Sequence, residues 1–143
     1  MRNRIWVWFS VLVFTLALLA RLLPGPRTID DAYITFRYAR NILAGNGFLY
    51  NPGERILGTT TPLYTFILVG LGALNGKAQA PFPWLALGVN ALADGFTCLL
   101  LLTLGRRLGV PWAGVATALF WAVAPFSVTF AIGGLETSLY VLL

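Results

Sequence analysis

Long apolar runs separated by short polar segments are the dominant pattern along this chain. They cover residues 5–23, 83–104 and 110–132, and a further run begins at 135–143. Each complete run has the roughly 20 residues that a helix needs to cross the hydrocarbon core of a bilayer. Runs of this length are too long for a soluble core of this size. The pattern therefore predicts an all-α, polytopic membrane protein.

A more polar loop over residues 24–82 follows the first run, and a helix is expected near its start, over residues 31–44. Thr28 is a candidate cap, and Asp31 would lie in the first turn, where the helix dipole favours acids. Apolar side chains gather on one side of this helix, and Arg37 and Arg40 fall on the other. Such a helix is typical of one lying in the membrane surface. The glycines of residues 45–47 end it.

A second helix is expected over residues 62–74, after a run of threonines and before Asn75-Gly76. Its apolar stretch is only about 20 Å long as a helix, which is short for the hydrocarbon core. We therefore expect it to lie half-buried in the interface, with a full crossing as the alternative.

The distribution of basic residues sets the expected orientation. The basic head at residues 1–4 belongs in the cytoplasm by the positive-inside rule, so the first span runs outward. A cleaved signal peptide is the competing interpretation, but no small-residue cleavage site follows the run. If residues 62–74 do not cross, Arg106 and Arg107 are also cytoplasmic. The loop over 24–82 and Glu136 then share the outer side of a plasma (inner) membrane.

The composition supports a membrane protein and excludes other classes. The chain is 58% hydrophobic and 10% charged, with a mean hydropathy of +0.78. Its net charge of +5 fits topology and lipid contact, and no basic stripe interleaved with aromatics indicates nucleic acid. The chain has no histidine, so a metal would need oxygen ligands, which favours Mg²⁺, Mn²⁺ or Ca²⁺.

Three carboxylates on one side of the membrane are the candidate chemical groups. Asp30 and Asp31 are adjacent, and Glu136 follows the third span. Neighbouring acids can share a divalent cation, or one can act as a base toward a hydroxyl group. The alternative is structural, because acids at a helix start commonly serve as caps.

Arg37 and Arg40 are candidates for binding a phosphate group. They are about one helical turn apart, and the guanidinium fork matches phosphate oxygens. The alternative is that both arginines anchor the helix at lipid headgroups.

Asp94 lies near the middle of the second apolar run, with Asn90 one turn earlier. A charge at the bilayer centre is costly unless it is paired, protonated or faces a wet cavity. One interpretation is a structural contact between helices with Asn90 as the partner. The other is a functional pair in a transporter segment or a non-catalytic membrane subunit.

Several motifs together resemble the N-terminal part of the C-type (GT-C) membrane glycosyltransferases, over nearly the whole chain. The nearest branch contains the mycobacterial-type arabinofuranosyltransferases; protein O-mannosyltransferases and lipid A aminoarabinose transferases are more distant. The motifs are Asp30-Asp31-Ala-Tyr-Ile-Thr-Phe-Arg-Tyr-Ala-Arg-Asn, Gly45-Asn46-Gly47, Asn51-Pro52-Gly53-Glu54-Arg55, Gly58-Thr-Thr-Thr-Pro62-Leu63-Tyr64 and Gly134-Leu135-Glu136-Thr137.

The resemblance implies an inverting enzyme that uses a polyprenyl-phosphate sugar donor on the outer face of the membrane. It further implies that Asp30 is the base or a metal ligand, that Asp31 and Glu136 assist it, and that a Mg²⁺ or Mn²⁺ ion is a candidate cofactor. The acceptor would be a cell-envelope glycan, lipid or protein. The chain is expected to be the N-terminal piece of a longer protein, lacking the later spans and inactive alone.

Overall fold

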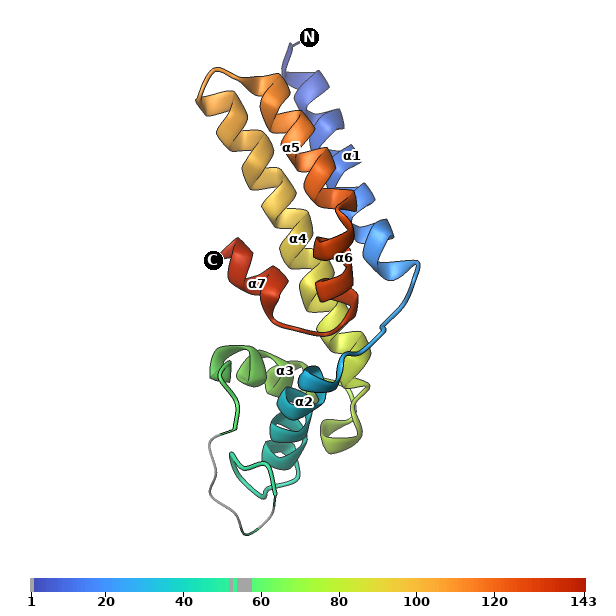
Figure 1. The fold of residues 1–143 in the computed structure, drawn as a ribbon, viewed down its shortest axis with the longest axis vertical. Helices are drawn as coiled ribbons and strands as arrows, with labels where there is room; N and C mark the ends of the chain where they lie inside the picture. Colours follow the sequence, from blue (N-terminus) through green and yellow to red (C-terminus); the bar gives the residue numbers. More distant parts are fainter. Residues whose placement is uncertain (1, 52, 54–57) are drawn as a thin grey trace.

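The computed structural model describes residues 2–51, 53 and 58–143, with side chains from residue 4 onward. Three helices lie side by side in the upper part of Figure 1: α1 (Arg2–Leu22), α4 (Phe82–Arg107) and α5 (Pro111–Val123). Small residues allow the closest approach between α4 and α5, since a Cβ on Gly105 would lie 2.6 Å from the Cα of Gly114. Close backbone packing of this kind is common between helices in membranes.

The third expected span is a bent pair of helices. After α5 the chain continues as α6 (Pro125–Ile132), and the two are bent by 46°. Pro125 cannot donate the backbone hydrogen bond that a continuous helix requires, which accounts for the bend at this residue. A glycine-containing loop then leads into α7 (Thr137–Leu142), which lies beside α4.

The predicted fold class is confirmed. Within the described residues all regular structure is helical, and α1 and α4 are each long and apolar enough to cross a bilayer. The bent pair α5–α6 adds a third candidate span if it is counted as one. The assignment of an outer and an inner side stays a prediction.

A second layer of short helices lies at the end of the bundle where α1 ends and α4 begins; we refer to it as the loop end. It consists of α2 (Asp30–Leu43), α3 (Pro62–Leu74) and the 3₁₀ helix η1 (Lys77–Gln79). Figure 1 places α3 beside α2 rather than among the long helices. A small apolar core around Phe36, Leu68 and Phe82 joins this layer to the start of α4.

The helix bounds lie within three residues of those expected from the sequence. Helix α3 has the expected bounds, while α4 extends three residues past the predicted end, to include the Arg106–Arg107 pair. Helix α2 begins at Asp30 rather than Asp31, and Thr28 does not cap it. The cap position belongs to Ile29, whose backbone N–H bonds to Gly133 instead. Most of the motif at residues 51–55 lies outside the described residues.

Candidate active site

Asp30 and Asp31 occupy the first turn of α2, and both side chains are exposed. Neither carboxylate caps the helix, and within the described residues neither forms a hydrogen bond or ion pair. Their charge is favourable near the positive end of the helix dipole. The simple structural explanation, that these acids are caps, therefore does not hold, and both carboxylates face outward without a protein partner in the described part of the chain.

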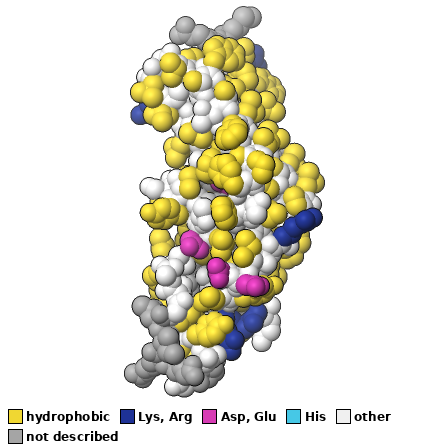
Figure 2. Space-filling model, in the orientation of Figure 1, with side chains coloured by type: hydrophobic (Ala, Val, Ile, Leu, Met, Phe, Trp, Pro, Cys, Tyr) yellow, Lys and Arg dark blue, Asp and Glu magenta, His cyan; other side chains and the backbone are white. Residues whose placement is uncertain are grey.

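Two backbone hydrogen bonds join the start of α2 to the loop that carries Glu136. The N–H of Arg27 donates to the Ile132 carbonyl (2.8 Å), and the N–H of Ile29 donates to the Gly133 carbonyl (2.9 Å). A Cβ on Gly133 would lie 2.6 Å from Cδ1 of Ile29 and 3.0 Å from the Thr129 carbonyl oxygen, so a larger residue there would force the Ile29 side chain to move. The fold therefore brings the two acid-bearing segments together, and Figure 2 shows acidic side chains gathered on one face in the lower half of the molecule.

Glu136 is half-buried at the residue before α7 and lines a cavity of about 200 Å³. The cavity lies between the start of α3 and α7; its other lining residues are Thr60, Thr61, Pro62, Leu63, Tyr64, Leu139, Tyr140 and Leu143. Burial raises the pKa of the Tyr64 phenol, the hydrogen bond with Asn90 lowers it, and the charge of Glu136 raises it further. The phenol therefore stays protonated at neutral pH and acts as a hydrogen-bond donor beside the carboxylate.

Arg37 and Arg40 lie on the exposed side of α2, as predicted, but their guanidinium groups contact the loop-end backbone. Arg37 donates from Nε to the Tyr50 carbonyl (3.1 Å) and from Nη2 to Asn51 Oδ1 (2.8 Å), and it lies 4.5 Å from the centre of the Tyr50 ring. Arg40 donates from Nε to the Ala78 carbonyl (3.2 Å). No ion pair joins either arginine to an acid in the described chain. Both arginines have structural contacts, and phosphate binding stays a prediction.

The expected metal site stays a prediction. Within the described residues no group of three or more histidine, cysteine, aspartate or glutamate side chains is placed to hold a metal ion. Asp30, Asp31 and Glu136 therefore do not form a ready set of three ligands, although oxygen ligation by such acids is what Mg²⁺ or Mn²⁺ would require.

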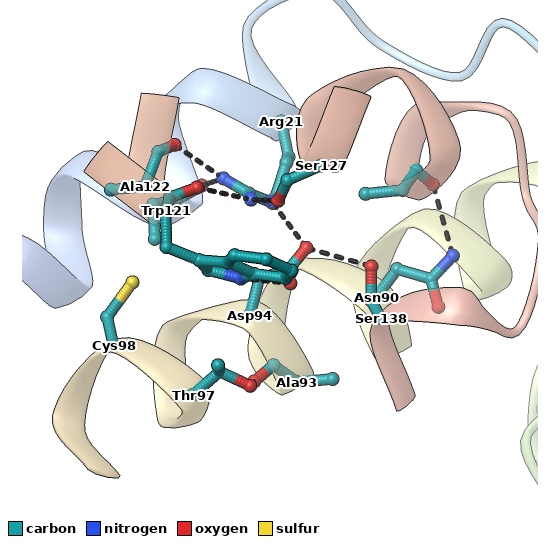
Figure 3. A network of polar contacts seen from close by, with 12 residues as sticks. Arg21, Asn90, Ala93, Asp94, Thr97, Cys98, Trp121, Ala122, Ser127 and Ser138 are labelled. Carbon is teal, nitrogen blue, oxygen red and sulfur yellow. Dashed lines mark hydrogen bonds and ion pairs between the residues drawn. The ribbon is translucent and has the colours of Figure 1, made fainter. Parts of the chain in front are cut away.

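The most extensive polar network lies inside the bundle, around Asp94 and Arg21 (Figure 3). Both side chains are fully buried, and Arg21 Nε donates to Asp94 Oδ2 at 2.7 Å. Trp121 Nε1 donates to Asp94 Oδ1 (2.9 Å), and the Ser138 hydroxyl donates to Oδ2 (2.8 Å). The expectation that Asn90 is the partner of Asp94 is wrong, because Arg21 reaches the carboxylate from α1. Asn90 bonds to other groups.

Arg21 also donates hydrogen bonds to backbone carbonyls at the break between α5 and α6. Its Nη1 donates to the carbonyls of Ala17 (3.0 Å) and Ala122 (2.8 Å), and its Nη2 donates to the Trp121 carbonyl (3.4 Å) and the Ser127 hydroxyl (2.6 Å). In a continuous helix the Trp121 carbonyl would accept from residue 125, where proline has no N–H. An unpaired carbonyl in a bilayer is costly, so the guanidinium replaces the missing donor.

Sequence reasoning missed Arg21, although a signal was present. A single arginine inside one apolar run and a single aspartate inside another are each expensive in a membrane. Two such residues of opposite charge are candidates for pairing, which lowers that cost. The network explains both residues as structural groups, because Asp94 and all five N–H donors of Arg21 have partners.

The comparisons with known proteins agree with one branch of the resemblance. A terminal β-(1→2)-arabinofuranosyltransferase of Mycobacterium tuberculosis is 35% identical over 118 residues, which is 77% of this chain and 18% of the relative. An enzyme of the same name from Corynebacterium glutamicum is 42% identical over 60 residues, 41% of this chain and 9% of the relative. The chain is homologous to these arabinofuranosyltransferases.

Homology to the terminal arabinofuranosyltransferases confirms the resemblance drawn from the motifs and links the chain to a pentosyltransferase. The chain spans less than a fifth of the length of either relative. No family model matches it. No solved structure matches it either.

Proposed function

We propose that this chain is part of an inverting membrane glycosyltransferase, of the pentosyl- or hexosyltransferase type. It would move a sugar from a polyprenyl-phosphate donor to a glycan, lipid or protein acceptor of the cell envelope. The relatives are named as arabinofuranosyltransferases, so an arabinofuranosyl group is the first sugar to test. The site would face the outer side of the plasma membrane. The observation that carries this proposal is the backbone pairing of Ile29 with Gly133, which brings the acids of α2 toward the Glu136 loop.

The chemistry proposed for Asp30 is that of a general base. Its carboxylate takes the proton from an acceptor hydroxyl as the oxygen of that hydroxyl attacks the anomeric carbon of the donor. The new bond joins the acceptor oxygen to the sugar, and the bond from the anomeric carbon to the phosphate oxygen breaks. The electron pair leaves with polyprenyl phosphate. A positioned base of this kind contributes about 10²- to 10⁴-fold to a rate, which is large enough to be decisive in an assay.

Asp31 and Glu136 have assisting roles in this proposal. Their carboxylates would accept hydrogen bonds from the acceptor's hydroxyl groups and so hold the attacking oxygen beside Asp30. The partly exposed carboxylate of Glu136 and the cavity beside it offer a place for hydroxyl groups of a sugar. Arg37 and Arg40 stay candidates for the leaving phosphate, because a guanidinium would offset its developing charge.

A transporter or non-catalytic subunit built on Asp94 and Asn90 has less support. Both side chains are fully buried and occupied by protein partners. A residue that carries an ion or solute needs a free ligand position, and within the described residues Asp94 offers none. The same contacts account for both residues as structural elements of the bundle.

The direct test is the substitution Asp30→Asn in the complete, membrane-embedded protein, assayed for sugar transfer from a polyprenyl-phosphate donor. We expect the rate to fall by about 10²-fold or more, while expression and insertion are unchanged. Gln79→Ala is a matched control, because Gln79 is an exposed polar residue at the same end of the molecule but on η1. Near-normal transfer by the Asp30→Asn variant would rule out the role proposed for this acid.

A further inference from the structure

Asn90 lies on α4 directly against the loop that precedes Glu136. It is fully buried, and both protons of its side-chain amide are used. Nδ2 donates to the Ala131 carbonyl (3.1 Å) and to the Leu135 carbonyl (2.7 Å). These two carbonyls stand on either side of the Gly133-Gly134 pair. A single amide group therefore bridges the loop, and its second acceptor belongs to the residue immediately before Glu136.

Tyr64 reaches the same loop from α3. Its hydroxyl lies 3.2 Å from the Gly134 carbonyl and 3.5 Å from Asn90 Oδ1, with the carbonyl as the nearer acceptor. The side chain is 2% exposed and also lines the cavity that contains Glu136. Asn90 and Tyr64 thus donate to three carbonyls within five residues of the loop; we call these two side chains the loop clamp.

The loop needs such donors because its backbone cannot form helical hydrogen bonds throughout. Gly134 has a φ of +83°, a conformation that few residues other than glycine adopt. Buried carbonyls left without a donor would be costly. One turn further along α4, Asp94 accepts from Ser138. Helix α4 therefore holds the chain on both sides of Glu136, through Leu135 before it and Ser138 after it.

We infer that Asn90 and Tyr64 are positioning residues, which fix the Glu136 carboxylate relative to the start of α2 through their hydrogen bonds to the backbone of its loop. This inference rests on the proposed function, because Glu136 matters for transfer only if the acids form the site. A misplacement of about 1 Å can lower a catalysed rate on the order of 10²-fold. Loss of the clamp should therefore lower kcat and leave the KM for the donor nearly unchanged.

The first test asks whether the loop clamp fixes the position of the Glu136 loop relative to α2. Spin labels are attached to cysteines introduced at Tyr33 and Tyr140, in a Cys98→Ala background. Both positions are exposed, one on α2 and one on α7. We expect Asn90→Leu to broaden or shift the distance distribution between the labels. Tyr64→Phe keeps the ring and removes one donor, so it should give a smaller change and remain folded. Thr97→Val is the matched control, because this buried hydroxyl donates only to Ala93 of its own helix. Unchanged distances in both clamp variants would overturn the inference.

The kinetic part uses a double-mutant cycle with Glu136→Gln. If the clamp acts through Glu136, then Asn90→Leu should lower kcat about 10²-fold alone and add little to the loss caused by Glu136→Gln. Multiplicative losses would overturn the inference, because they would show that Asn90 acts independently. A fully active Glu136→Gln variant would instead refute the proposed role of that acid, and the label distances would still decide whether the clamp exists.

Discussion

The buried charges of the bundle and the exposed charges of the loop end differ in how completely they are paired. Arg21 and Asp94 have no exposed surface, and every polar atom of their side chains has a partner. Asp30 and Asp31 are exposed and have no partner within the described residues. A membrane interior requires pairing for stability, whereas water does not. Complete pairing thus indicates a structural group, and an exposed acid without a protein partner is available to a ligand.

The largest expected effect on stability follows from Asp94→Leu. This change leaves the Arg21 charge buried without its partner, which typically costs about 3–5 kcal/mol. We expect a large fall in thermal stability in detergent, measured by the loss of a monodisperse peak after heating. The double variant Arg21→Leu with Asp94→Leu should regain part of that loss, because it removes the uncompensated charge. If Asp94→Leu were silent, the network could not be the structural element described here.

A smaller loss of stability is expected from Gly133→Ala. This substitution tests the contact between the start of α2 and the loop that joins α6 to α7. Its new Cβ would lie 2.6 Å from the Ile29 side chain, and overpacking of this kind costs about 1–3 kcal/mol. The start of α2 should shift, so sugar transfer should fall more than stability does. Gly109→Ala is a useful control because a Cβ there meets no neighbour, although its φ of +77° adds local strain. Equal losses of transfer in the two variants would argue against a special role for the Ile29 contact.

Arg37→Gln should have a modest effect on stability. The side chain is exposed, and its contacts with Tyr50 and Asn51 are worth about 1 kcal/mol or less at such a site. If the guanidinium also binds the donor phosphate, the KM for the donor should rise, and Arg37→Lys should recover only part of the affinity. An unchanged KM would leave Arg37 as a structural residue of the loop end and remove it from the proposed site.

The smallest effect on stability is expected from Asp30→Asn and Glu136→Gln. Neither carboxylate has a partner in the described part of the chain, and such surface changes are usually within about 0.5 kcal/mol. Thermal unfolding of both variants should therefore match that of the parent protein. A large destabilisation by either change would show that the acid is a structural group. It would then contradict the difference between the paired charges of the bundle and the unpaired acids of the loop end.

Local signals in the sequence were sufficient for much of the fold. Pro62 at the start and Asn75-Gly76 at the end predict α3, and Pro125 predicts the bend of the third span, because proline and glycine act on the backbone of their own segment. Helix α2 was misplaced by one residue because its start depends on Gly133, a residue more than 100 positions away.

The partners of the buried polar groups could not be predicted in the same way. Asn90 lies one turn from Asp94, so local spacing favoured that pair. The actual partners, Arg21 for Asp94 and the loop carbonyls for Asn90, depend on which helices become neighbours. For the acids at the loop end, the expected topology and the resemblance predict that Asp30, Asp31 and Glu136 lie on one side of the membrane and belong together. The fold supports this through the pairing of their segments, and their chemical roles stay predictions.

The guanidinium of Arg21 has a consequence for the bend at Pro125. Because it already donates to the carbonyls of Trp121 and Ala122, an alanine at position 125 would offer a new N–H to an acceptor that is already occupied. The helix would then gain little by straightening, and straightening would take two carbonyl acceptors away from a buried guanidinium. The angle of this span is therefore held by electrostatics as well as by the proline ring, and a sequence with another residue at 125 could keep the same bend.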